Sequence, residues 1–282
     1  MRSLIERLKQ NAIIAILKYL LISVICLILG DAVSDLIGTA SWQSELTFLL
    51  FSQVFLFFIF WKRRYANYSF KFNYSASNGF SVKNLYFWST VACIGCVLFD
   101  MMLQEVLPIE AWDTMIWRDS DPEPSSYLIF DAIGLYLLAP IVEEGVCRGA
   151  IERRLLERFK NPWIAILISA IIFSAMHLNL TQGVTFLGVL VGWVYYCTRN
   201  LWPCIFIHAL NNILVSLWDF QSIPLGVSIP LLVMGMVILY FSMRQIARST
   251  NGHARIPVEA ISPIGLDSAD GIETEDNPST EL

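Results

Sequence analysis

The sequence predicts an all-α polytopic membrane protein with about eight transmembrane helices. The chain of 282 residues is 56% hydrophobic and has a mean hydropathy of +0.57, whereas an ordinary soluble domain is about 45–50% apolar. Its apolar residues also gather in stretches of about 20, the length that a helix needs to cross about 30 Å of hydrocarbon. A chain of this composition is built to be surrounded by lipid.

The apolar stretches define eight expected spans. They cover residues 12–30, 45–61, 84–104, 126–150, 162–178, 183–199, 201–218 and 224–243. The first run contains Lys18, which lies close enough to one end for its ammonium group to reach the membrane surface. Six cysteines fall in or beside these stretches, where cysteine behaves as a small hydrophobic residue, so no disulfide framework is expected.

The positions of Lys and Arg predict the orientation. If the eight spans are counted as above, nearly all basic residues fall on one side, and Arg118 is the only basic residue in the opposite connections. Because basic connections stay in the cytoplasm, both termini are expected there, in a multi-pass protein of the cytoplasmic (inner) membrane. The opposite side carries one long acidic loop. The net charge of -5 owes much to the last residues and says little about partners.

Ionisable residues are concentrated in three of the spans. Glu143, Glu144 and Arg148 lie in the fourth, His177 closes the fifth, and His208 lies in the seventh. Such side chains cost several kcal/mol in lipid unless they pair or face a water-filled cavity, so they mark a functional site. Asp100 and Asp131 are interpreted differently, because both are expected near external span ends, where solvation is easy.

Helix geometry separates the two glutamates. Neighbouring side chains point about 100° apart, whereas residues four apart share a face. Arg148 is therefore expected to pair with Glu144, which leaves Glu143 for a cavity formed by the fourth, fifth and seventh spans. Pro140 should bend the helix beside these carboxylates, because it removes a backbone hydrogen bond.

The other two helices contribute imidazoles and an amide. Phe173 lies one turn before His177, and Asn212 shares a face with His208. Carboxylate, imidazole and amide groups together suit activation of a water molecule and stabilisation of an oxyanion. Depth is less consistent. At about 1.5 Å per residue, Glu143 and His208 lie roughly 10 Å from the cytoplasmic ends of their spans, and His177 lies about 20 Å from its own.

At these positions the sequence resembles the CPBP family of intramembrane proteases. The runs APIVEEGVCRGAI, FSAMH and HALNN match the motifs EExxxR, FxxxH and HxxxN in order. The family includes the eukaryotic CAAX prenyl endopeptidase and bacterial relatives associated with bacteriocin self-immunity. The resemblance covers residues 126–218, roughly a third of the chain.

The resemblance implies a role for each matching residue. Glu143 would act as general base on the hydrolytic water, with His177 binding or polarising that water. His208 and Asn212 would donate hydrogen bonds to the oxyanion, while Glu144 and Arg148 hold the site together. No metal is assigned. The family was described as metalloproteases, and if zinc takes part, its ligands would be Glu143, His177 and His208, although the usual HExxH spacing is absent.

Four regions follow from this interpretation. Residues 1–125 hold three helices and the acidic external loop, 126–218 the catalytic core, 219–248 the last helix, and 249–282 a disordered acidic cytoplasmic tail. The predicted partners are a peptide or membrane-protein substrate and the bilayer, with no nucleic acid.

Two other functions fit the same residues. Glu, His and Arg in spanning helices also form proton relays, so an ion-coupled transporter is one alternative, although the internal repeats of many transporters are absent from the sequence. A non-catalytic membrane scaffold is the other. The pair Gly188 and Gly192 is interpreted as a site of close helix contact.

Overall fold

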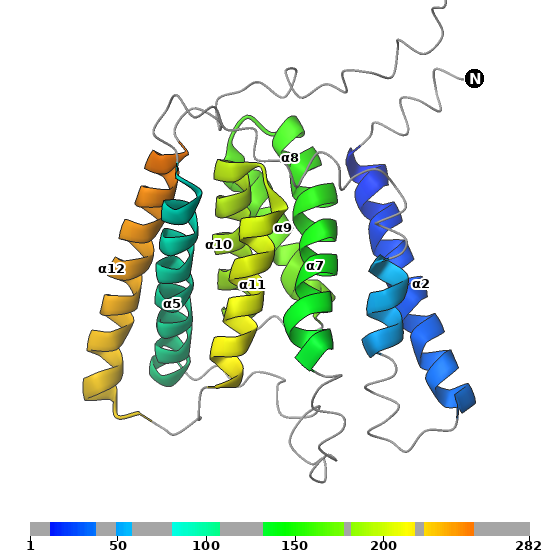
Figure 1. Ribbon diagram of the computed structural model, residues 1–282, viewed down its shortest axis with the longest axis horizontal. Coiled ribbons are helices and arrows are strands. Elements are labelled where there is room, and N and C mark those ends of the chain that lie inside the picture. Colours follow the sequence, from blue (N-terminus) through cyan, green and yellow to red (C-terminus); the bar gives the residue numbers. More distant parts are fainter. Residues whose placement is uncertain are drawn as a thin grey trace, which may run out of the picture.

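In the computed structural model, the structure describes residues 12–37, 49–57, 81–107, 132–177, 182–217 and 223–250. Every regular element in these ranges is a helix (Figure 1), which agrees with the predicted all-α class. The acidic loop over 108–131, with Asp131, and the tail beyond residue 250 lie outside the described residues.

The helices overlap the predicted spans, but three extend well beyond the expected ends. One ends at Ile37 instead of residue 30, the last ends at Ser249 instead of residue 243, and the third is the helix that carries the glutamates. The fourth expected span, 126–150, belongs to a helical run that continues to Arg158. This run consists of the π-helix η2 (Gly134–Leu138), α7 (Ala139–Glu144), the π-helix η3 (Gly145–Glu152) and α8 (Arg153–Arg158). The other labelled helices are α2 (Ala12–Ile37), α5 (Val82–Val106), α9 (Pro162–Met176), α10 (Gln182–Thr198), α11 (Leu201–Ser216) and α12 (Leu225–Ser249). An additional helical segment covers 49–57.

Local sequence signals set several helix ends. Asn161 caps α9 by accepting a hydrogen bond from the Trp163 N–H at 3.0 Å, and Pro162 occupies the first turn, where its missing N–H costs nothing. Asn200 caps α11 in the same way, through the Trp202 N–H at 2.8 Å. Arg199, between α10 and α11, has a φ of 51°, the left-handed conformation that ends helices.

The helices are arranged with α5 and α12 on one side, the elements from α7 to α11 in the middle, and α2 on the other side (Figure 1). The contact between α5 and α12 is close because glycines meet there. A Cβ on Gly235 would lie 2.7 Å from the Phe99 nitrogen, and one on Gly95 would lie 2.9 Å from the Leu239 nitrogen. The other side of α5 packs on α10 and α11, which form one wall of the site.

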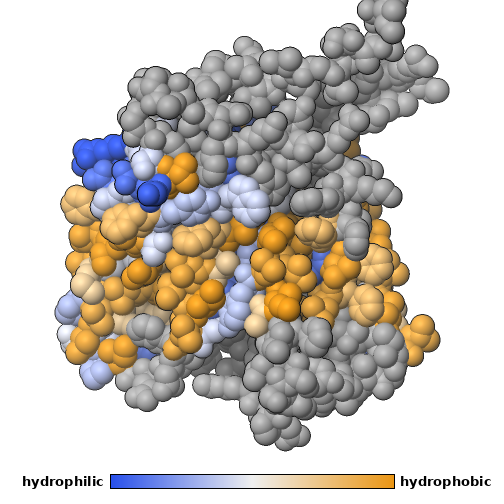
Figure 2. All heavy atoms as spheres, in the orientation of Figure 1, coloured by the Kyte–Doolittle hydropathy of each residue, from blue (hydrophilic) through white to orange (hydrophobic). Residues whose placement is uncertain are grey.

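The outer surface is that of a membrane protein. Among the described residues, two helices are long and apolar enough to cross a bilayer, Val82–Val106 and Leu225–Ser249, and shorter apolar helices lie between them. Figure 2 shows apolar residues across the middle of the visible face. On α12 the exposed large apolar side chains are Leu225, Val227, Ile229, Val233, Met234, Met236, Val237, Tyr240 and Phe241.

Two predictions about individual polar residues have different outcomes. All six cysteines are free and buried, as expected of small apolar residues. The expected easy solvation of Asp100 is wrong, because this residue is 6% exposed. Its carboxylate lies against Gly183 in the first turn of α10, where the positive end of the helix dipole favours a negative charge.

Candidate active site

The backbone that carries the glutamates is wound as a π-helix on both sides of α7. The Ala139 N–H bonds the Gly134 carbonyl five residues earlier. In this pattern the Leu135 carbonyl would receive the N–H of residue 140, but Pro140 has none. The amide nitrogen of Asn212, Nδ2, instead donates to the Leu135 oxygen at 3.0 Å. One side chain of α11 therefore completes the hydrogen bonding of the helix before the glutamates.

Arg148 pairs with Glu144, as the spacing predicts. Nη1 donates to Glu144 Oε1 at 3.3 Å, and Nε lies 3.2 Å from Oε2. Nη2 donates to the Gly188 carbonyl of α10 at 2.8 Å. Both side chains are fully buried, so the charges attract each other in a low dielectric, and removal of either partner would leave the other as an uncompensated buried charge.

His208 joins the two glutamates. Its Nδ1 lies 2.8 Å from Glu144 Oε1, and its Nε2 lies 3.7 Å from Glu143 Oε2. Because Glu144 is also bound to Arg148, it is the natural acceptor for the Nδ1 proton. A carboxylate in this position fixes the orientation of the imidazole and stabilises its protonated form.

His177 approaches Glu143 from the opposite helix. Its Nε2 lies 3.2 Å from Glu143 Oε2, and its Nδ1 lies 2.8 Å from the Phe173 carbonyl. A carbonyl only accepts hydrogen bonds, so Nδ1 carries a hydrogen. In the neutral ring, Nε2 is then a bare acceptor facing a carboxylate, and the contact is favourable only when one proton lies between them. Among the described residues no hydrogen bond reaches Glu143 Oε2, so the structure places the two groups close together without one.

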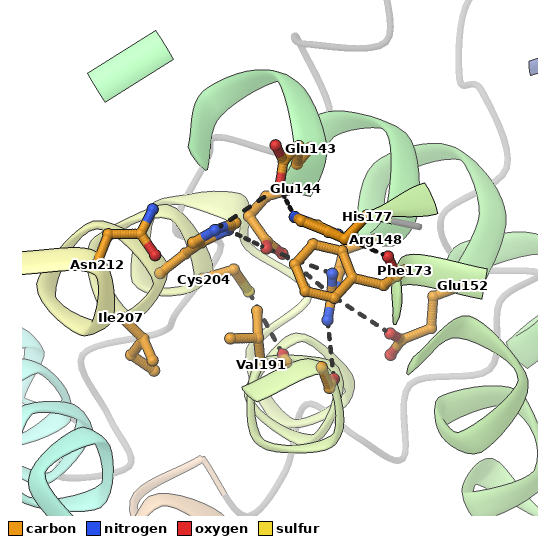
Figure 3. Close-up of polar contacts among 12 residues, drawn as sticks. Glu143, Glu144, Arg148, Glu152, Phe173, His177, Val191, Cys204, Ile207 and Asn212 are labelled. Atoms are coloured by element: carbon orange, nitrogen blue, oxygen red, sulfur yellow. Dashed lines mark hydrogen bonds and ion pairs between the residues drawn. The ribbon is translucent and has the colours of Figure 1, made fainter. Parts of the chain in front are cut away.

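Phe173 organises the same group of residues. Its ring lies under the Arg148 guanidinium, with 4.7 Å between Cζ and the ring centroid. It also meets the His177 and His208 rings edge-on, at centroid distances of 4.6 and 5.5 Å. Figure 3 shows the ring beside Arg148 and His177. The first residue of FxxxH therefore packs against three of the ionisable side chains.

The mismatch in depth between Glu143 and His177 disappears because the helix of Glu143 extends further than predicted. The helix of Glu143 ends at Arg158, 15 residues later, and His177 lies 15 residues after Pro162. His208 lies at the same level although it comes early in α11, because its Nε2 is 3.7 Å from Glu143 Oε2.

Asn212 is the predicted residue that the described contacts place apart from this group. Its amide bonds the Leu135 carbonyl, and Figure 3 shows it to one side of Glu143 and His177. An amide nitrogen has two hydrogens, so one donor is left after this bond.

Glu152 is a functional candidate that the sequence analysis missed. It is fully buried, and its Oε2 lies 3.8 Å from Arg148 Nε. The spacing offers a signal, because Glu144, Arg148 and Glu152 follow one another at intervals of four. The predicted end of the span at residue 150 had placed Glu152 outside the membrane.

The geometry also bears on a metal ion. Within the part of the chain that the structure describes, no three His, Cys, Asp or Glu side chains are grouped so as to hold a metal. Zinc binding by Glu143, His177 and His208 stays a prediction.

The fold and these contacts define a helical membrane protein with a buried group of carboxylates and imidazoles drawn from three helices. Residues 125–214 match the family model described as "Type II CAAX prenyl endopeptidase Rce1-like". The match confirms the resemblance to the CPBP proteases over this part of the chain.

A curated relative agrees with this resemblance. The chain is 28% identical over 122 residues to the "Putative membrane peptidase YdiL" of Bacillus subtilis (strain 168), an overlap of 41% of this chain. The chain spans about half the length (50%) of that relative. No solved structure matches the chain.

Proposed function

We propose that the protein is an intramembrane endopeptidase in which Glu143 activates a water molecule for attack on a peptide bond. The observation that supports this most directly is the approach of two imidazoles, from α9 and α11, to one oxygen of Glu143. The distances to Oε2 are 3.2 Å from His177 and 3.7 Å from His208. The Glu143 side chain is 16% exposed, whereas that of Glu144 is 0% exposed, so only the first is accessible to a reactant.

The proposed reaction begins with proton transfer. Glu143, assisted by His177, takes a proton from water as the water oxygen bonds to the carbonyl carbon of the substrate. The carbonyl oxygen becomes an oxyanion, which accepts a hydrogen bond from the protonated Nε2 of His208. The tetrahedral intermediate then collapses, the C–N bond breaks, and the leaving amine receives the proton that Glu143 had taken. No covalent enzyme intermediate is formed.

The remaining residues support these steps. Glu144 accepts the Nδ1 hydrogen of His208 and stabilises the imidazolium, while Arg148 holds Glu144 in place. Asn212 donates its second amide hydrogen to the oxyanion, with Leu135 holding the first. A hydrogen bond to an oxyanion in a buried site is worth about 2.7–4 kcal/mol.

The proposed setting is multi-pass insertion in the cytoplasmic membrane, with both termini in the cytoplasm. Basic side chains support this orientation. Arg153, Arg154 and Arg158 lie on α8, which is found at the same end of the molecule as the last turns of α12, with Arg244 and Arg248 (Figure 1). Basic residues gathered at one end of a membrane protein mark its cytoplasmic side.

The proposed substrate is a lipid-modified or membrane-inserted peptide that enters from the cytoplasmic half of the bilayer. The domain match to prenyl endopeptidases supports a prenylated C-terminal peptide as the first substrate to test. A hydrophobic unmodified peptide is the second.

Replacement of Glu143 tests the function. The full chain in proteoliposomes is given a farnesylated CAAX peptide and a library of hydrophobic peptides, and the products are identified by mass spectrometry. Glu143→Gln should abolish cleavage, because an amide cannot accept the proton of water. Glu157→Gln is the matched control, since this glutamate is 42% exposed and contacts Arg153. Cleavage by Glu143→Gln at the parent rate would refute the proposal.

An ion-coupled transporter is the second candidate. A continuous series of contacts joins ionisable side chains from Glu143 through His208, Glu144 and Arg148 to Glu152. Proton relays are built from side chains arranged in this way. The same proteoliposomes, loaded with a pH-sensitive dye, distinguish the two functions. A transporter would move protons without cleaving a peptide, and Glu143→Gln would stop that movement.

A further inference from the structure

Glu152 is a buried acid that the proposed reaction does not use. Its side chain is 0% exposed, and among the described residues neither of its oxygens has a hydrogen-bond partner. Burial of a carboxylate costs several kcal/mol unless a charge compensates for it. The compensating charge is Arg148, whose Nε lies 3.8 Å from Glu152 Oε2.

Arg148 is shared between two carboxylates through one atom. The same Nε lies 3.2 Å from Glu144 Oε2 and 3.8 Å from Glu152 Oε2. The other nitrogens are also engaged, Nη1 by Glu144 and Nη2 by the Gly188 carbonyl. Glu152 therefore limits the direction in which the guanidinium can turn.

The orientation of Arg148 is transmitted to His208 through one oxygen. Glu144 Oε1 accepts from Arg148 Nη1 at 3.3 Å and from His208 Nδ1 at 2.8 Å. A rotation of the guanidinium moves this oxygen, and with it the imidazole that faces Glu143.

Gly192 makes room for Glu152. A Cβ on Gly192 would lie 2.8 Å from Glu152 Oε2 and 3.1 Å from Ile166 Cγ2. Four residues earlier on α10, Gly188 supplies the carbonyl that binds Arg148. The pair Gly188 and Gly192 allows close helix contact, as predicted. Arg148 approaches the first glycine and Glu152 the second, so both partners of the ion pair lie against this part of α10.

We propose that Glu152 is a positioning residue of the active site. It holds Arg148 and, through Glu144, sets the orientation of His208. Residue 192 is a glycine because the Glu152 carboxylate occupies the space that a side chain would fill. This inference rests on the proposed function, since the positioned imidazole is the one assigned to the oxyanion.

Glu152→Gln tests the inference, because it keeps the shape of the side chain and removes its charge. We expect kcat to fall about 10-fold to 100-fold, the usual effect of removing a group that orients a functional side chain, with KM changed less than about twofold because no contact with the substrate is lost. Glu157→Gln, which alters an exposed acid on the same helical run, should leave both constants unchanged.

A spectroscopic measurement does not depend on cleavage. The chain has three histidines, so isotope-labelled histidine gives few ring signals in an NMR spectrum of the full chain in detergent. Glu152→Gln should shift the signals of His208, whereas Glu157→Gln should leave them in place. If the parent cleaves nothing, the proposed function fails, and these signals still decide the role of Glu152.

Gly192→Ala provides a second variant, which displaces the carboxylate but keeps its charge. It should lower kcat and shift the His208 signals in the parent. In a Glu152→Ala background, Gly192→Ala should cost no further activity, because the space next to residue 192 is then empty. The contact of the new side chain with Ile166 is the same in both backgrounds, so it cancels in the comparison. Equal losses in the two backgrounds, or unchanged kcat and His208 signals in Glu152→Gln, would overturn the inference. If Glu152→Gln does not fold, the Gly192→Ala pair decides.

Discussion

At the scale of single residues, Asn212 links the backbone of one helix to the proposed chemistry of another. Its amide nitrogen donates to the Leu135 carbonyl. This carbonyl has no backbone donor, because residue 140 is a proline and has no N–H. The same amide nitrogen is proposed to bind the oxyanion, so the backbone bond would hold the amide ready for the reaction. A preorganised donor of this kind stabilises a transition state without having to reorient.

Asn212→Ala should therefore lower both stability and activity. Leaving the Leu135 carbonyl without a donor costs about 1–3 kcal/mol, and loss of one oxyanion donor lowers kcat about 10²-fold to 10³-fold. Thermal unfolding in detergent measures the first effect and cleavage in proteoliposomes the second. If the variant is less stable but keeps the parent kcat, Asn212 has only a structural role and the oxyanion role is wrong.

Local spacing was sufficient to predict some contacts in the site. The pairing of Glu144 with Arg148 and the separate direction of Glu143 follow from residues four and one apart on one helix. The bond from His208 to Glu144 and the bond from Arg148 to the Gly188 carbonyl join residues 64 and 40 apart. They depend on how α10 and α11 pack against the Glu143 helix, which a single sequence does not specify.

At the scale of elements, the π-helical winding on both sides of α7 is the feature that sequence patterns could not supply. Apolar periodicity predicts a helix but does not distinguish hydrogen bonds to the fourth residue from those to the fifth. Pro140 gave a partial signal, because a missing N–H was expected to disturb the helix at this point. The boundary at 150 was wrong because Glu152, Arg153 and Arg154 were interpreted as the polar end of a span, whereas Glu152 is buried beside Arg148.

A pair of substitutions can separate the two roles of Asn212. Pro140→Ala gives residue 140 an N–H, so that the Leu135 carbonyl has a backbone donor in either winding. In this background Asn212→Ala should cost less than about 0.5 kcal/mol of stability, the scatter expected for uncoupled substitutions. The loss of kcat should persist. Recovery of kcat along with stability would refute the oxyanion role and assign Asn212 to repair of the helix.

At the scale of the whole molecule, the site is built into the middle helices, and α12 is attached to them mainly through α5. The sequence predicted both elements as spans, because long apolar runs are the strongest signal that a membrane protein gives. It did not predict that α12 pairs with α5, since the two helices lie far apart along the chain. The pairing depends on backbone contact at two glycines.

Gly235→Ala should loosen this pair of helices. The new Cβ would lie 2.7 Å from the Phe99 nitrogen and 3.1 Å from the Gly95 carbonyl oxygen. Neither is a flexible side chain, so the helices must move apart, which should cost about 1–3 kcal/mol. Thermal unfolding followed by circular dichroism measures the loss. Gly226→Ala, on the same helix with nothing within 4 Å, is the matched control and should melt with the parent.

The aromatic ring of Phe173 has one more consequence. It contacts the guanidinium and both imidazoles, yet it neither gains nor loses a proton. Through a catalytic cycle the groups around it would change charge, and their mutual attractions would weaken and strengthen in turn. The uncharged ring packed between them keeps its shape at every stage. It would therefore maintain the distances between the reactive groups even when their charges no longer attract one another.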